Sequence, residues 1–131
     1  MTSDPRQVTG EWGERVARRY LEKREGMRLL DRRWRHGHGE LDLIMRQGGV
    51  MVFVEVRVRT AEADPLAAYR SIGRGKWRVL RGTAIAYLRQ CPWRPEAARF
   101  DVVGIRRTAD GRFQDLEHWQ NVGTFGRGWR F

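Results

Sequence analysis

The chain has 131 residues, with 26 basic and 16 acidic side chains and a formal net charge of +10, which suits one domain with a single core and a polyanionic partner. Its one cysteine, Cys91, excludes an internal disulfide, and no apolar run approaches the length of a membrane span. We therefore expect a reduced, cytoplasmic protein of bacterial type that makes no membrane contact, and nucleic acid is the commonest partner of such a basic protein.

The first predicted element is an amphipathic helix that begins near Asp4-Pro5 and ends near Gly26. Its apolar stripe recurs every four residues at Val8, Trp12, Val16 and Tyr20. Glu14 falls on the flank of this stripe. Two interpretations of Glu14 are open: a surface ion pair with Arg18 at i+4, or a carboxylate that reaches a site on a sheet beneath the helix.

A short strand over Met27 to Trp34 follows, and its end is strongly basic because of Arg32, Arg33 and Arg35. The next residues, His36-Gly37-His38-Gly39, form a predicted turn. The two histidines have no third soft ligand nearby in the sequence. We therefore expect loop histidines near a phosphate path rather than a transition-metal site.

The stretch after this turn contains acidic side chains at regular spacing within otherwise apolar strands. Its two halves, Glu40–Arg46 and Val50–Arg59, are rich in β-branched and aliphatic residues. They are joined by Gln47-Gly48-Gly49, which is typical of a hairpin turn. The sequence therefore predicts a β-hairpin here.

Side chains alternate along a strand, so we expect Leu41 and Leu43 to pack with the valines of the second strand. Asp42 and Glu55 then emerge together on the opposite face, with Arg57 beside them. Two neighbouring carboxylates raise each other's pKa, and a divalent cation relieves that repulsion. Because Mg²⁺ is typically held by one or two carboxylates with waters and substrate phosphates, this face is a candidate metal site.

Two further segments follow the hairpin. Thr60 to Arg74 has little periodic pattern, which indicates a loop or a broken turn, with a mobile flap over the site as one interpretation. The next segment is a second amphipathic helix, whose apolar face is Trp77, Leu80, Ala84, Tyr87 and Leu88.

The last predicted strands are Arg99 to Arg107 and Phe113 to Trp119, joined by a turn at Asp110-Gly111. Asp101 either forms an ion pair with Arg57 or Arg99 and so orients the site, or caps the end of the sheet. Residues 1–119 then form one domain with a mixed sheet and a helix on each side. Residues 120–131 form a Gly-, Arg- and aromatic-rich tail, which is either flexible or suited to base stacking.

Asp42, twelve intervening residues and then Glu55-Val56-Arg57 resemble the D…(D/E)-x-K signature of restriction-endonuclease-like nucleases. A longer ordered set of motifs is similar to that of the bacterial YraN family, whose fold is similar to that of archaeal Holliday junction resolvases. These motifs are Gly13-Glu14, GELDLI, VFVEVR and Arg99-Phe100-Asp101-Val102-Val103. The resemblance covers roughly residues 10 to 119 and implies an α/β fold with a restriction-endonuclease-like core, a mixed β-sheet flanked by two helices.

The resemblance also implies a metal-dependent endonuclease that acts on branched or single-strand-containing DNA, and it makes a homodimer a reasonable expectation. Asp42, Glu55 and the Val56 carbonyl would hold Mg²⁺ or Mn²⁺. Arg57 would occupy the lysine position and stabilise the phosphorane charge, and Glu14 would complete the metal shell through a water. The expected phosphate contacts are Arg32, Arg33, Arg35, Arg59, Arg74, Lys76 and Arg78.

Arg57 departs from the lysine of the nuclease signature, and an arginine cannot act as a general base. Lys76, one of only two lysines, either substitutes for that lysine or is an ordinary surface residue. The departure leaves a second interpretation open, a non-catalytic nucleic-acid-binding module that retains the nuclease fold. A third interpretation is a ribosome- or RNA-associated protein, which the charge and the tail also permit.

Overall fold

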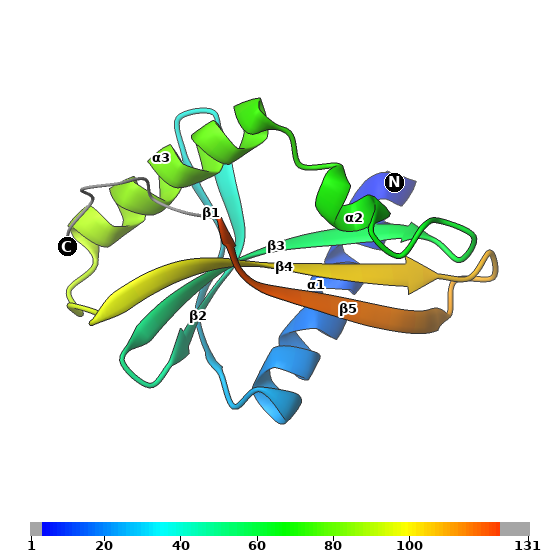
Figure 1. Ribbon diagram of the computed structural model, residues 1–131, viewed down its shortest axis with the longest axis horizontal. Helices are drawn as coiled ribbons and strands as arrows, with labels where there is room; N and C mark the ends of the chain where they lie inside the picture. The colour runs from blue at the N-terminus through cyan, green and yellow to red at the C-terminus, as the bar shows by residue number, and fades with distance from the viewer. Residues whose placement is uncertain (1–3, 124–131) are drawn as a thin grey trace.

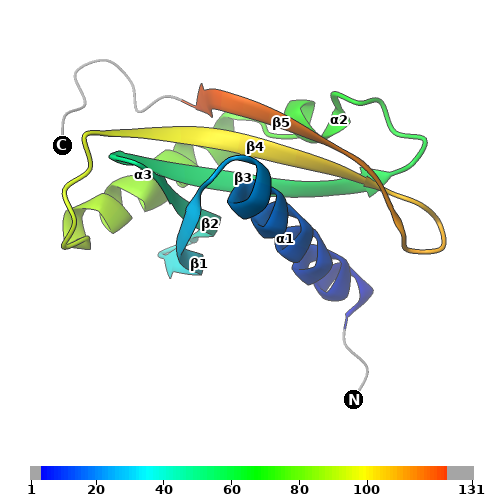
Figure 2. The ribbon, with the colours of Figure 1, turned by 90° about the horizontal axis from the view of Figure 1, so that it is seen from below.

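The computed structural model describes residues 4–123, which fold into a five-stranded sheet and three helices. Along the chain the elements are α1 (Pro5–Arg24), β1 (Arg28–His36), β2 (Gly39–Gln47), β3 (Val50–Thr60), α2 (Ala67–Arg70), α3 (Arg74–Gln90), β4 (Ala97–Arg107) and β5 (Phe113–Gly123). The strand order is β1-β2-β3-β4-β5, which Figure 2 shows from one edge of the sheet to the other. Among the described strands only β3 and β4 pair in parallel, so the expected α/β class and mixed sheet are confirmed.

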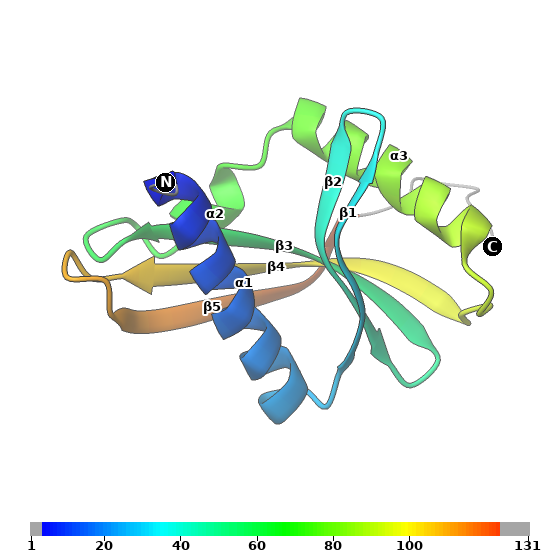
Figure 3. The same ribbon diagram turned by 180° about the vertical axis from the view of Figure 1, so that it is seen from behind.

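The two long helices cover opposite faces of this sheet, and each face has its own apolar cluster. Figures 1 and 3, seen from opposite sides, place α1 behind the sheet and in front of it, respectively. The α1 cluster contains Ala17, Leu21, Leu43, Met45, Val52, Val54, Val103 and Ile105. The α3 cluster contains Leu41, Ile44, Phe53, Leu80, Ala84, Tyr87, Phe100 and Val102. Within residues 4–123, no helix has both the length and the apolar character needed to cross a membrane.

A glycine lets α1 lie directly on β3. Gly13 is buried on the sheet-facing side of the helix, and a Cβ atom there would come 2.5 Å from Cγ2 of Val58. Real Cβ atoms do not approach other atoms so closely, so any larger residue would push the helix away. The close approach explains why the Gly13-Glu14 pair matters physically, since Gly13 sets the distance at which Glu14 meets the sheet.

The segment between β3 and α3 was expected to be a loop or a broken turn, and it contains the short helix α2. Ala68 of this helix is buried against Gly104 of β4, where an added Cβ would come 2.7 Å from the Ala68 Cβ. The ring of Tyr69 packs beside that of Trp119, with centroids 5.7 Å apart. Small residues at a close contact leave little periodic signal, which is why the sequence pattern missed this turn of helix.

Strands β2 and β3 are paired over only part of their length, so they form a fork. Their register runs from Gln47↔Val50 to Leu43↔Val54 and is not continued beyond. Arg33, which lies across from this end of β2, has a positive φ of 50°. The tip of the β1–β2 hairpin bends towards α3, where Gly39 fits against Thr83 (Figure 1).

The bend corrects one expectation about the hairpin. Leu43 packs with Val52 and Val54 as predicted, but Leu41 belongs to the other cluster, with Phe53. Strict alternation would have kept Leu41 and Leu43 on one face. It fails because the backbone of the hairpin changes direction between these two leucines, where β2 leaves β3.

The final strand is longer than expected. β5 continues to Gly123, so it includes the first residues of the segment 120–131 that was expected to be a tail. The rest of that segment, residues 124–131, lies outside the described residues.

Candidate active site

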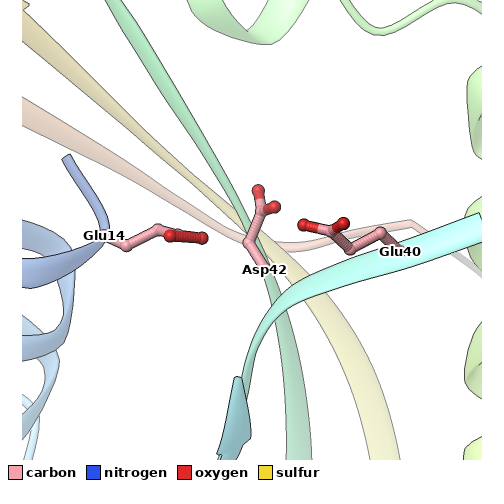
Figure 4. Close-up of side chains that lie close together, drawn as sticks. All are labelled: Glu14, Glu40 and Asp42. Atoms are coloured by element: carbon pink, nitrogen blue, oxygen red, sulfur yellow. The ribbon is translucent and has the colours of Figure 1, made fainter. Parts of the chain in front are cut away.

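Three carboxylates gather at the fork between β2 and β3. Glu14 comes from α1, and Glu40 and Asp42 come from β2. One oxygen of each side chain lies within 4.8 Å of the others, and all three side chains are partly buried. Figure 4 shows Glu14 and Glu40 pointing towards Asp42 from opposite sides.

Glu40 was not among the predicted site residues, although the sequence contained a signal for it. It precedes Asp42 by two positions, and residues at this spacing share one face of a strand. The same alternation that exposed Asp42 therefore also indicated Glu40.

The Asp42 side chain accepts a hydrogen bond from β3 where the backbone of β2 no longer pairs with that strand. The Val56 N–H donates a hydrogen bond of 2.9 Å to Oδ2 of Asp42, beyond the point where β2 and β3 stop pairing. Burial, and then the neighbouring Glu55 carboxyl group, raise the pKa of Asp42 well above its ordinary value, and the Val56 hydrogen bond opposes this only in part. The predicted meeting of Asp42 and Glu55 is thus present. The expected contact of a metal with the Val56 carbonyl stays a prediction.

Glu55 is buried and is contacted by two cations. Its side chain is 4% exposed. Nη2 of Arg57 donates to Oε2 of Glu55 at 2.9 Å, and Nζ of Lys76 lies 3.8 Å from the same oxygen. Arg57 is on β3 and Lys76 is in the first turn of α3. The structure therefore places a lysine beside Glu55, although the lysine position of the motif is occupied by arginine.

The structure decides between the two interpretations of Glu14. Its carboxylate accepts hydrogen bonds of 2.8 and 3.2 Å from Nε of Arg33, whereas Arg18 pairs with Glu22. Burial raises the pKa of Glu14, the charge of Glu40 adds to this, and the Arg33 ion pair opposes it. Glu14 thus faces the acidic cluster rather than the surface of α1.

Five of the predicted nucleic-acid contacts fall into two groups. Arg33 and Arg35 form ion pairs with the acidic cluster, Arg33 with Glu14 and Arg35 with Glu40 at 2.7 Å. Another set is available to solvent on α3, consisting of Arg74, Lys76 and Arg78. Arg59, near the end of β3, belongs to neither group, and burial followed by the charge of Arg57 lowers the pKa of its guanidinium.

Asp101 is outside this site. Its fully buried carboxylate accepts hydrogen bonds from Arg99 and from the Asn121 N–H, and it lies 2.8 Å from Nε2 of His118. Burial alone would raise the pKa of Asp101, but these hydrogen bonds, led by that of His118, outweigh it and hold the pKa below its ordinary value. Of the predicted partners, Arg99 is therefore correct and Arg57 is wrong.

The donor set at the fork suits a hard divalent cation. All four acidic side chains, those of Glu14, Glu40, Asp42 and Glu55, offer carboxylate oxygens, which are the ligands that Mg²⁺ and Mn²⁺ prefer. The pKa of Asp42 is raised first by burial and then by repulsion from Glu55, and a bound cation would relieve that repulsion. The residues present therefore fit such an ion.

Comparisons with known proteins give a family but no activity. The sequence profile of the uncharacterised protein family UPF0102 matches residues 13–105, a range that contains all four site carboxylates. A UPF0102 protein of Pelotomaculum thermopropionicum is 44% identical over 120 residues, which cover 92% of this chain and 98% of that protein. One from Frankia alni is 39% identical over 118 residues, covering 90% and 96% of the two chains.

Proposed function

This chain belongs to the uncharacterised protein family UPF0102, as the resemblance to the YraN family predicted, and we propose that it is a metal-dependent endonuclease acting on DNA. The observation that carries the proposal is the buried Glu55, which lies beside Asp42 at the fork and contacts both Arg57 and Lys76. Carboxylates for a metal, from β2 and β3, and cations for a phosphate, from β3 and α3, thus meet at one site. This combination supports phosphodiester hydrolysis.

The proposed cofactor is Mg²⁺ or Mn²⁺, held by Asp42 and Glu55 with Glu14 and Glu40 nearby. Such an ion supplies Lewis-acid chemistry: it lowers the pKa of a bound water and withdraws charge from a phosphate. The chain's own residues prepare the site for it. Val56 fixes the Asp42 carboxylate through its N–H, and Arg33 orients that of Glu14.

Two cations would act on the scissile phosphate. An arginine cannot act as a general base, so the role of Arg57 would be to stabilise negative charge that develops on the phosphate oxygens. The Lys76 ammonium can also donate a proton, so it would hold the attacking water by a hydrogen bond to that water's oxygen or protonate the leaving oxygen. Glu55 orients both groups because the same carboxylate oxygen contacts each of them.

The fold is consistent with the restriction-endonuclease-like core that we propose for it. The acidic residues lie where two strands of a mixed sheet separate, with a helix on each face. The DNA backbone would pass the exposed cations of α3, Arg74 and Arg78, and continue towards Arg59. Cleavage of a branched substrate needs two incisions, so the proposal includes a homodimer in a cytoplasmic setting.

The test is a cleavage assay on labelled duplex, single-stranded, flap and four-way DNA with Mg²⁺, Mn²⁺ or EDTA. We expect the wild type to cut one member of the panel only with a divalent ion. Glu55→Gln should reduce that rate on the order of 100-fold or more, because it removes a charge at the reacting centre. Glu22→Gln, on the outer side of α1 where Glu22 pairs with Arg18, is the matched control and should leave the rate unchanged.

The second candidate is a nucleic-acid-binding module without catalysis. Arg33 and Arg35 already neutralise Glu14 and Glu40, and an arginine occupies the motif's lysine position. If neither the wild type nor Glu55→Gln cuts any substrate while both bind DNA equally in EDTA, this candidate replaces the nuclease. Sedimentation with and without four-way DNA measures the proposed dimer.

A further inference from the structure

A groove runs between α1 and β5, on the flank of α1 that faces away from the acidic cluster. Its cavity volume is about 900 Å³, within the range of sites that hold small organic ligands. One wall is made by α1 and the other by the start of β5, from Phe113 to Leu116. β1 and β5 are the opposite edges of the sheet, and Figure 3 shows the start of β5 and the β1–β2 hairpin on opposite sides of α1. The groove, lined by the start of β5, therefore lies away from that hairpin.

The groove is positively charged. Four cations of α1 line it, namely Arg15, Arg19, Lys23 and Arg24. Within the described chain its one lining carboxylate is Asp115, which is already bound by Arg106 through Nε at 2.8 Å and through Nη2. The cations therefore outnumber the local acids, and a polyanion would complement them.

The same groove presents aromatic rings. Phe113 opens β5 and is 51% exposed, an unusual position for a large apolar side chain. Trp12 and Tyr20 line the α1 wall, Trp12 beneath the Arg107 guanidinium at 4.5 Å and Tyr20 held through its hydroxyl by Glu25. These two rings are fixed by their partners, so among the groove's described aromatic residues Phe113 is the ring exposed enough to stack on a ligand.

From this combination we propose that the α1–β5 groove binds single-stranded nucleic acid, independently of the acidic site. Phosphates would lie along the α1 cations, and a base would stack on Phe113. A duplex fits less well because its bases already stack on one another and cannot reach the ring. A second copy of this chain also fits less well. Each copy has a net charge of +10, so two basic grooves would repel each other.

The test is fluorescence anisotropy of labelled oligo-dT and oligo-rU in EDTA, on wild type and on the Asp42→Asn variant, so that cleavage plays no part. Arg19→Ala with Lys23→Ala should weaken binding on the order of tenfold and lower the salt slope by about 1.4, or 0.7 per lost contact. Its matched control is Arg18→Ala with Arg28→Ala, which removes two exposed charges outside the groove. The control should change binding by less than about twofold.

Stacking is tested at Phe113. Phe113→Ala should weaken oligo-dT binding on the order of tenfold with an unchanged salt slope, and Phe113→Tyr should restore it. Val8→Ala, at an exposed apolar residue of α1 outside the groove, should have no effect. Melting temperatures of all variants identify any that fail to fold.

Three outcomes would overturn the groove proposal. Equal losses in the groove pair and in the control pair would mean that net charge alone drives binding. Wild-type binding by Phe113→Ala would show that Phe113 does not stack on the nucleic acid. Polyglutamate could also displace the labelled oligonucleotide as well as unlabelled oligo-dT does. If that displacement depends on Phe113, the ligand is an acidic polypeptide. Loss of cleavage with intact groove binding would instead count only against the proposed nuclease.

Discussion

Nζ of Lys76 lies 3.8 Å from Oε2 of Glu55, although the two residues belong to different elements of the fold. Lys76 is in the first turn of α3, and its partner is a buried carboxylate in the middle of β3. The nuclease signature would have placed a lysine at position 57, two residues after Glu55, where this chain has arginine. Lys76 therefore brings an ammonium group to the site from α3 rather than from β3.

This relationship predicts the effect of changing Lys76. Lys76→Ala should reduce metal-dependent cleavage on the order of 100-fold, because it removes a charge and a proton donor from the reacting centre. Lys76→Arg keeps the charge but is a much weaker proton donor. It should therefore bind DNA as wild type does, without recovering the cleavage rate. Arg89→Ala, exposed near the end of the same helix, serves as the control. A wild-type rate in Lys76→Ala would show that Arg57 acts alone.

A second prediction concerns the stability of the acidic cluster. A carboxyl group whose pKa is raised by folding is destabilising when charged, so Asp42 weakens the metal-free protein at neutral pH. Asp42→Asn keeps an oxygen that can accept the Val56 N–H and removes the charge. In EDTA it should raise the free energy of unfolding on the order of 1 kcal/mol, and the gain should shrink as the pH falls towards 4.

Mg²⁺ should make wild type more stable than Asp42→Asn, because the ion binds only the folded protein and only with an intact site. Thermal unfolding of both proteins in EDTA and in Mg²⁺ measures the effect. If wild type is the more stable protein in EDTA, or if Mg²⁺ stabilises both proteins equally, the cluster is not a metal site.

A third prediction uses two glycines of α1 as a matched pair. At Gly13 a methyl group would meet Val58 at 2.5 Å, whereas at Gly10 it would meet none of residues 4–123 within 4 Å. Gly13→Ala should therefore cost about 1–3 kcal/mol of unfolding free energy through overpacking. Gly10→Ala should stabilise by about 0.5–1 kcal/mol, because alanine is the better helix former. Urea unfolding distinguishes the two, and destabilisation of equal size would contradict the close packing of α1 on β3.

The parts of the site that follow from local geometry could be predicted from the sequence. Alternation along two strands placed Asp42 beside Glu55, and the helical period placed Glu14 on the sheet-facing flank of α1. Both rules act over a few residues. The strand run of the hairpin, the second long helix and the final strands were predicted for the same reason.

What could not be predicted depends on contacts between distant segments. Leu41 changes face where β2 leaves β3, and no alternation rule contains that bend. Lys76 reaches Glu55 only because α3 packs over the fork, so the sequence left its role open. Arg33 and Arg35 were interpreted as phosphate contacts from their charge, but charge does not reveal that acids lie within reach.

The last prediction concerns Asp101, which lies apart from the acidic cluster and tests stability rather than catalysis. Its pKa is lowered by folding, so its charged form is favoured in the native protein by Arg99, His118 and the Asn121 N–H. A lowered carboxyl pKa contributes stability above the ordinary value of about 4, and that stability is lost as the pH falls through the lowered value. Asp101→Asn should therefore cost about 2–4 kcal/mol at pH 7, since it leaves buried donors poorly matched. The difference from wild type should shrink below about pH 4.

Urea unfolding from pH 7 to pH 3 measures this, with Asp110→Asn, at an exposed carboxylate paired with Arg112, as the control. A penalty that stays constant down to pH 3 would mean that packing around Asp101, and not its charge, stabilises this end of the sheet.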